Sequence, residues 1–94
     1  DMKMKYKLYR KYDDPGHGWL AVKYQELKEL NLLNDISPCS YQKGKTVYLE
    51  EDSDLTKFSN AYIKLFGKYP DWKTTISDES SWIRSLNRYE KGEN

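Results

Sequence analysis

The chain has 94 residues, and its 16 basic and 15 acidic side chains leave a formal net charge of +1. Nearly balanced charge, together with nine Tyr, three Trp and two Phe, argues against intrinsic disorder, which goes with high net charge and few aromatic residues. No apolar run approaches the roughly 20 residues of a membrane span, and a single cysteine, Cys39, excludes an internal disulfide. We therefore expect one cytoplasmic domain over residues 1–94, frayed at 1–3 and 90–94, with no contact to a membrane.

The first element that the sequence predicts is a β-strand at residues 3–12. Met4, Tyr6 and Leu8 alternate with basic residues, and a period of two is typical of a strand with one buried face. The predicted outer face is basic and consists of Lys3, Lys5, Lys7 and Lys11. Residues 13–16 read Asp-Asp-Pro-Gly and predict a turn, after which residues 19–22 form a short extended segment.

The middle of the chain predicts a helix, a hairpin and a second helix. Apolar residues recur every three positions at 24–30, with Asn31 or Asn34 as the end of that helix. Strands at 40–42 and 46–51 flank a turn in which Gly44 takes a positive φ. The next helix carries an apolar stripe and ends at Gly67, and the stripe consists of Leu55, Phe58, Tyr62 and Leu65.

The last quarter of the chain predicts a loop and one more helix. Residues 68–76 are expected to be a loop anchored by Tyr69 and Trp72, and residues 77–89 a helix whose apolar side carries Trp82. Arg84 and Arg88 lie one turn apart and either form a clamp for an anion or remain solvated. The fold class is therefore α+β, with a small antiparallel sheet of about three to four strands and two to three helices packed on one face.

The only histidine lies in the segment DPGHGWL, residues 14–20. An imidazole titrates near neutrality and can act as a general base, yet no sequence spacing pairs His17 with Asp14, Cys39 or Glu50. We expect instead that the imidazole hydrogen-bonds the backbone of the turn while Trp19 enters the core. No catalytic residue, no cofactor and no enzymatic activity are predicted, although a small enzyme centred on His17 stays as a third interpretation.

The acidic segment EEDSD, residues 50–54, raises the question of a metal site. Oxygen ligands suit Mg²⁺ or Ca²⁺, but the segment lacks the glycine and the distal glutamate of an EF-hand loop. Acidic groups at the N-terminal end of a helix explain it without a metal. One histidine and one cysteine also exclude a zinc site of the standard type, and no metal site is predicted.

Three motifs together suggest a family: DPGHGWL, SPCSYQKGKTVYLEEDSD and WIRSLNRY. From Asp14 to Tyr89 the chain resembles small proteins of phages, plasmids and other mobile genetic elements, with Cys39 at a position where that pattern has an aromatic residue. The resemblance implies a protein that binds a host protein and blunts host defence, as anti-CRISPR and anti-restriction proteins do.

The leading hypothesis is a non-enzymatic protein that acts in the host cytoplasm and inhibits a defence nuclease complex by occupying its surface. Plentiful tyrosine and tryptophan with mixed charge suit such recognition. The predicted partner-binding residues are Tyr41, Gln42, Lys43, Glu50, Glu51, Asp52 and Asp54. The alternative is a nucleic-acid-binding accessory protein that uses the basic strand, namely Lys3, Lys5, Lys7 and Lys11.

Overall fold

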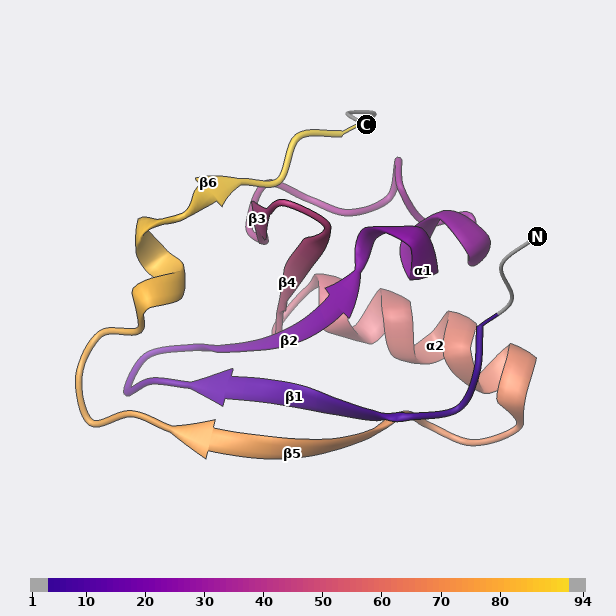
Figure 1. The fold of residues 1–94 in the computed structure, drawn as a ribbon, viewed down its shortest axis with the longest axis horizontal. Helices are drawn as coiled ribbons and strands as arrows, with labels where there is room; N and C mark the ends of the chain where they lie inside the picture. Colours follow the sequence, from indigo (N-terminus) through magenta and orange to yellow (C-terminus); the bar gives the residue numbers. More distant parts are fainter. Residues whose placement is uncertain (1–3, 92–94) are drawn as a thin grey trace.

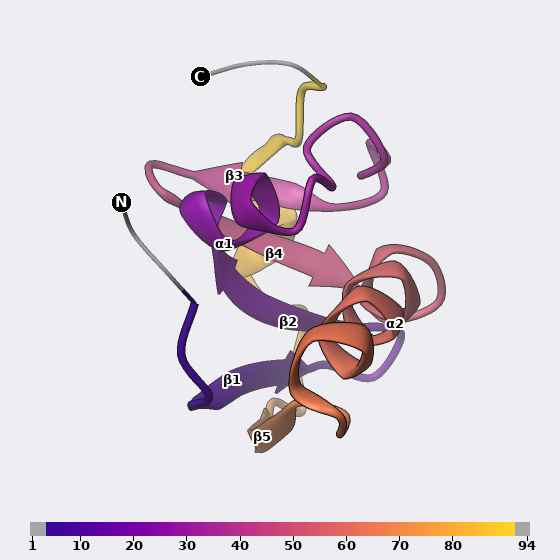
Figure 2. The same cartoon turned by 90° about the vertical axis from the view of Figure 1, so that its right-hand side faces the viewer.

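The computed structural model describes residues 4–91, which form six strands, two α-helices and one 3-10 helix. The strands build one sheet in the order β5-β1-β2-β4-β3-β6, and both α-helices pack on the same face of it (Figures 1 and 2). The elements are β1 (Leu8–Asp13), β2 (Gly18–Lys23), α1 (Tyr24–Glu29), β3 (Tyr41–Lys43), β4 (Thr46–Glu50), α2 (Asp54–Phe66), β5 (Asp71–Ile76), η1 (Trp82–Ser85) and β6 (Asn87–Arg88). The α+β class is confirmed. The expected three to four antiparallel strands are wrong, because the sheet has six and β5 runs parallel to β1.

The turns and the central hairpin follow the local sequence. β1 and β2 pair antiparallel around the predicted turn, and β3 pairs with β4 around Gly44, whose φ of 59° is in the left-handed region. Asn31 ends the first helix region with a φ of 58° and Gly67 ends α2 with a φ of 77°, as predicted. These positions are occupied by the residues that tolerate a positive φ best.

The N-terminal strand exists, but its two faces are the reverse of the prediction. Leu8 is 62% exposed, whereas Tyr9 and Lys11 are buried. The ring of Tyr9 lies edge-on to Phe58 and Tyr62 of α2, at centroid distances of 5.4 and 5.9 Å. Burying a tyrosine ring among aromatics outweighs the exposure of one leucine, so aromatic packing and not the alternation of lysines decides which face turns inward.

The C-terminal quarter differs most from the prediction. Residues 71–76 form β5 beside β1 instead of a loop, and three consecutive β-branched residues at 74–76 are typical of a strand. Tyr69 and Trp72 are exposed and do not anchor this segment. The helix expected at 77–89 is replaced by η1 and β6, because residues 87–88 pair with β3 and leave the helical path.

Two apolar clusters hold the layers together. The larger lies between the sheet and the helices and includes Leu20, Leu27, Val47 and Phe58; the smaller lies on the opposite face under η1, built from Trp19, Tyr41, Tyr48 and Ile83. Leu55, Phe58 and Tyr62 are buried as predicted, but Leu65 is exposed, because the helix turns that position away from the sheet. None of the helices within residues 4–91 has the length and apolar character needed to cross a membrane.

Candidate functional site

The turn between β1 and β2 is built around the carboxylate of Asp14. The Asp14 N–H donates to the His17 carbonyl at 2.8 Å, and Asp14 Oδ1 accepts the N–H groups of Gly16 and His17 at 3.0 and 2.9 Å. An aspartate that bonds the backbone two and three residues ahead fixes the turn. The backbone of His17, and not its imidazole, therefore makes the hydrogen bonds of this corner.

Arg84 holds the same carboxylate from the far end of the sequence. Its Nε donates to Asp14 Oδ2 at 2.6 Å and its Nη2 donates to Oδ1 at 2.9 Å, while the Ser81 N–H donates to Oδ2 at 2.9 Å. The Arg84 guanidinium and these N–H donors hold the pKa of the Asp14 carboxyl well below its usual range. The clamp predicted for Arg84 and Arg88 is therefore correct for Arg84 alone, and the carboxylate that Arg84 holds belongs to this chain. Arg88 instead donates to the Pro38 carbonyl at 3.0 Å.

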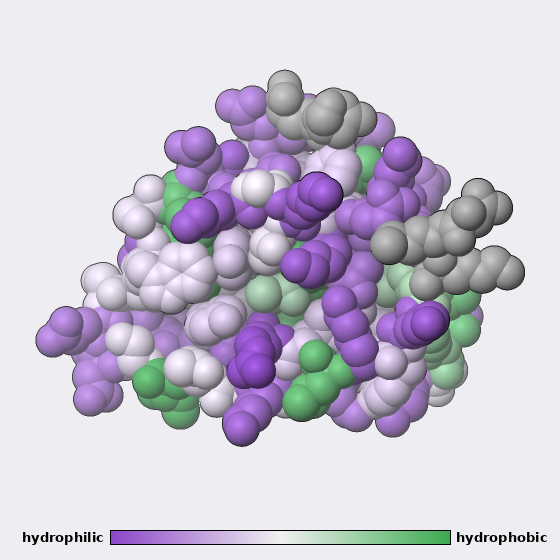
Figure 3. Space-filling view, viewed as in Figure 1, coloured by the Kyte–Doolittle hydropathy of each residue, from purple (hydrophilic) through white to green (hydrophobic). Residues whose placement is uncertain are grey.

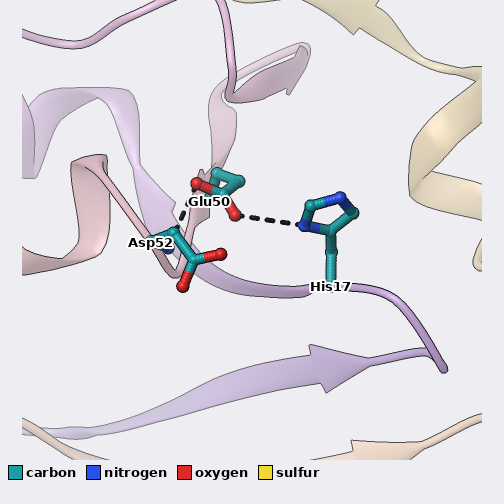
Figure 4. Close-up of side chains that lie close together, drawn as sticks. All are labelled: His17, Glu50 and Asp52. Carbon is teal, nitrogen blue, oxygen red and sulfur yellow. Dashed lines mark hydrogen bonds and ion pairs between the residues drawn. The ribbon is translucent and has the colours of Figure 1, made fainter.

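His17 lies beside two acidic residues at the end of β4 (Figure 4). Its Nδ1 is 3.3 Å from Glu50 Oε2, and the Asp52 carboxylate completes a group whose donor atoms all lie within 4.8 Å of one another. The register explains this proximity, because Glu50 pairs with Trp19 across β2 and β4. The prediction that the imidazole bonds the turn backbone is wrong, whereas the burial of Trp19 is confirmed.

Glu50 differs from its two neighbours because it is only 7% exposed. Its Oε1 accepts the Asp52 N–H and the Ser53 hydroxyl, each at 3.1 Å. Its Oε2 is buried and has no hydrogen-bond donor among the described residues. A base beside a carboxylate needs a hydroxyl or thiol within hydrogen-bond reach to form a nucleophilic pair, and within residues 4–91 the His17 imidazole has no hydrogen bond to a serine or cysteine.

A second charged cluster lies next to this corner. Lys11 Nζ is 2.5 Å from Asp13 Oδ1 and 3.1 Å from Glu51 Oε1. Burial alone lowers the pKa of the Lys11 ammonium, but the hydrogen bonds to Asp13 and Glu51 outweigh burial and raise that pKa. These side chains lie so close to Gly18 that a Cβ at this position would be 2.7 Å from both Lys11 Nζ and Glu51 Oε1. Only glycine fits there without displacing the ion pairs.

The predicted partner-binding residues do not form one exposed surface. Tyr41, Glu50 and Asp54 are buried, and Glu51 is ion-paired with Lys11. Asp54 is fully buried and accepts hydrogen bonds from the Ser37 N–H and hydroxyl, the Ser40 hydroxyl and Lys57 Nζ. Its carboxylate thus fixes the residues 37–40 to the start of α2. Of that predicted set, Lys43 and Asp52 are exposed and Gln42 is half-buried.

The face of the sheet opposite the α-helices carries a row of side chains that sequence reasoning missed. Strand register places one residue of each strand side by side across the sheet, and cross-strand partners share a face. This cross-strand row is Lys73, Arg10, Ala21, Tyr48, Tyr41 and Arg88. It has a cation at each end and two tyrosines between them. Figure 3 shows this face as a mixture of strongly hydrophilic and pale side chains with several separate hydrophobic patches.

The uncovered part of this face contains a shallow groove of about 340 Å³. Lys7, Arg10 and Lys23 contribute to its lining with Tyr12 and Tyr48, and no acidic residue does. Beside it, Trp82 is 50% exposed, and its ring lies 5.8 Å from that of Tyr12 and 5.3 Å from that of Tyr48. In the described part of the chain, no acidic side chain forms an ion pair with Arg10, Lys23 or Lys73.

The four lysines predicted as the basic face of the N-terminal strand differ in their surroundings. Lys11 is buried in its ion pairs, and Lys7 Nζ lies 3.1 Å from Glu26 Oε2. Lys5 is exposed, and Lys3 lies outside the described residues. The predicted set of four lysines is therefore not one continuous surface. Among the described residues, Arg10, Lys23 and Lys73 are exposed cations of the sheet that form no ion pair.

Comparison of the chain with protein-family models, with curated proteins and with solved structures finds no match. The similarity of its motifs to proteins of mobile elements stays a prediction. Chemistry-bearing residues meet at two places in the described chain: the corner at His17, and the open face of the sheet at Arg10 and Lys73.

Proposed function

We propose that the chain is a non-enzymatic binding domain that holds single-stranded nucleic acid on the open face of its sheet. The observation that carries the proposal is the pairing of Arg10 with Lys73 on neighbouring strands without an acidic partner in the described residues. Like charges placed side by side on a sheet are destabilising. A ligand with regularly spaced negative charges removes that repulsion.

The aromatic residues on this face favour unpaired bases over a duplex. Trp82 is half exposed and Tyr12 is partly exposed, and an exposed ring stacks on a base with about 1–3 kcal/mol per base. Bases within a duplex already stack on one another and offer no free face. Phosphates at the groove cations and bases on these rings form the binding mode of a sequence-tolerant single-strand binder.

A near-neutral net charge does not oppose this proposal. Several acidic residues of the described chain lie away from the open face. Asp14 and Asp54 are buried and accept hydrogen bonds, and Glu26 and Glu51 form ion pairs with lysines. The sum of charges is then small while one face is basic. Local charge, and not the total, sets the attraction of a polyanion at distances within the Debye length of about 8–10 Å.

The test is fluorescence anisotropy with a labelled oligothymidylate and an oligouridylate of about 15 nucleotides, a length that covers the usual site of such domains. The double variant Arg10→Glu, Lys73→Glu is expected to weaken binding at least about tenfold at low salt. The matched control, Lys28→Glu with Lys64→Glu, changes net charge equally at exposed positions on α1 and α2 and should bind far better than the first variant. Equal loss in the two variants would contradict a specific site on the sheet.

A second candidate function is inhibition of a host defence nuclease complex through the edge of the sheet. β5 is one of the two edge strands of the sheet, and all six of its residues are exposed. Ile76 and Trp72 are among the exposed large apolar residues. A long exposed edge pairs readily with an extended segment of another protein. This observation favours a protein partner that adds a strand to β5.

The test of this second function is a cleavage assay with a purified defence nuclease, of CRISPR or restriction type, with and without the protein. Inhibition that is abolished by Ile76→Lys but not by Leu65→Lys would support it, since both positions are exposed and only Ile76 lies on β5. Inhibition that survives Ile76→Lys would exclude the β5 edge as the contact. Unimpaired cleavage at saturating protein would count against inhibition of that nuclease.

A further inference from the structure

We propose that His17, Glu50 and Asp52 form a binding site for a divalent transition-metal ion of the Zn²⁺ class. The three residues offer one imidazole nitrogen and two carboxylate oxygens, all within 4.8 Å of one another. Glu50 ends β4 and Asp52 follows in the connection to α2, whereas His17 lies in the β1–β2 turn, 33 positions before Glu50. This site is independent of the nucleic-acid face and of the β5 edge.

The buried oxygen of Glu50 is the observation that points to a cation. Glu50 is 7% exposed, and its Oε2 is buried, faces His17 and has no hydrogen-bond donor in the described residues. A buried anionic oxygen without a donor is costly to maintain. Within residues 4–91 no lysine or arginine forms an ion pair with Glu50 or Asp52. His17 Nδ1 lies 3.3 Å from Oε2 and is cationic only when the imidazole is protonated. Beside a neutral imidazole, a metal ion bound to both atoms supplies the positive charge that this oxygen needs.

The surroundings hold the ligands in position. The Asp52 N–H and the Ser53 hydroxyl hold Glu50 Oε1 and thereby direct Oε2 toward the imidazole. The backbone of His17 is fixed through Asp14, whose carboxylate is held by Arg84. Hydrogen bonds that orient ligands in this way raise metal affinity about 10- to 100-fold.

The types of ligand atom determine which divalent ion the site prefers. Imidazole nitrogen favours Zn²⁺, Co²⁺ and Ni²⁺ over Mg²⁺ and Ca²⁺, which prefer oxygen ligands alone. Zinc–nitrogen and zinc–oxygen bonds of about 2.0–2.2 Å require the donor atoms to close together slightly. The His17 side chain is 45% exposed and Asp52 is exposed, so both can rotate to do so. The single cysteine and single histidine of the sequence exclude a zinc site made mainly of those two residue types. The set of one histidine and two carboxylates at this corner is not of that type.

Three protein ligands leave at least one position open for water or for an atom of a bound molecule. The ion would also join the β1–β2 turn to the connection between β4 and α2, two segments that meet here through backbone pairing of β2 with β4. Binding to the folded chain alone must then raise the temperature of unfolding.

The experiment uses the full chain with Cys39→Ser, because the exposed thiol of Cys39 is itself a zinc ligand. Isothermal titration with ZnCl₂ should give one saturable site per chain, and CoCl₂ should give a visible absorption spectrum of a nitrogen- and oxygen-bound ion. MgCl₂ at the same concentration should give neither signal. His17→Ala and Asp52→Asn should each weaken Zn²⁺ binding at least about tenfold, while Asp35→Asn, an exposed acid elsewhere, should leave it unchanged.

Each other outcome overturns the proposal. Absence of a saturable site for Zn²⁺ would show that the three side chains do not bind the ion. Binding that His17→Ala and Asp52→Asn leave at the level of Asp35→Asn would place the ion elsewhere. The two ligand variants are at exposed side chains and are expected to fold, which Glu50→Gln, at a buried carboxylate, does not guarantee; circular dichroism of each variant confirms the fold before titration.

Discussion

Replacing Asp54 by alanine tests whether this acidic residue is structural, as its burial implies. The variant removes a fully buried carboxylate and its hydrogen bonds with Ser37, Ser40 and Lys57. The Ser40 hydroxyl is itself completely buried and loses its acceptor. The Lys57 side chain is 42% exposed and is rehydrated in the variant, but each buried donor left without an acceptor costs about 1–3 kcal/mol. The hydrogen bonds lost at Ser37 and Ser40 together therefore cost about 3–5 kcal/mol, while a domain of this size has a free energy of unfolding of about 5–14 kcal/mol. The variant therefore loses a large fraction of its stability.

The assay is urea unfolding followed by tryptophan fluorescence, with thermal unfolding as a second measure. At about 4–8 °C per kcal/mol for a small domain, the midpoint of thermal unfolding should fall by at least about 12 °C. Asp52→Ala serves as the control, since that side chain is exposed and its loss should change stability by less than about 0.5 kcal/mol. A loss below about 1 kcal/mol for Asp54→Ala would refute the account of Asp54 as a buried anchor.

Three further predictions concern the open face, the corner and the second helix. Arg10→Ala with Lys73→Ala should flatten the plot of log affinity against log salt for single strands by about 1.4, at roughly 0.7 per phosphate contact; an unchanged slope would exclude these cations from the contact. Arg84 keeps the pKa of the Asp14 carboxyl in the folded state below its value in the unfolded state. The stability that the ionised Asp14 contributes is therefore fully present above pH ~4 and is lost as the pH falls below that value. The difference in stability between the wild type and Asp14→Asn should therefore shrink below pH ~4 in acid unfolding curves, and a difference that grows there would contradict the ion pair. Phe58→Ala should destabilise the fold by about 3–5 kcal/mol, whereas Leu65→Lys should stay within about 0.5 kcal/mol in urea unfolding; a large loss from Leu65→Lys would place that residue in the core.

Local chemistry made some elements predictable from the sequence. Gly44, Gly67 and Asn31 occupy positions with positive φ, and few residue types tolerate that conformation. The stripe at Leu55, Phe58 and Tyr62 identified α2, because an interval of three to four residues has no other simple explanation. These signals depend on neighbours within one or two turns of the chain.

Elements that depend on distant partners were not predictable in this way. The period-two pattern of the first strand fits either face, and only the rings of α2 decide that Tyr9 turns inward. Residues 74–76 are typical of a strand, but the sequence does not show that β1 is their parallel partner. The helix predicted at 77–89 does not form, because Arg88 pairs with Tyr41 of β3.

The candidate sites depend on register as well. His17 and Glu50 meet because Trp19 pairs with Glu50, and Arg10 meets Lys73 because β1 pairs with β5. The sequence correctly singled out His17 and the acidic segment as chemically notable, but it carries no signal that brings the two together. The sequence also shows the positive charge of the N-terminal strand, but Lys11 of the predicted basic face is buried, and Arg10, which that prediction did not include, is exposed.

The most direct test of the central claim is a titration of the ¹⁵N-labelled protein with unlabelled oligothymidylate, followed by amide chemical shifts. Binding on the open face predicts that the largest shifts cluster at residues that line it, with Arg10, Tyr12, Lys23 and Lys73 among them, while the exposed side of α2 stays unchanged. Shifts confined to α2, or none at low salt and high concentration of the oligonucleotide, would contradict the claim.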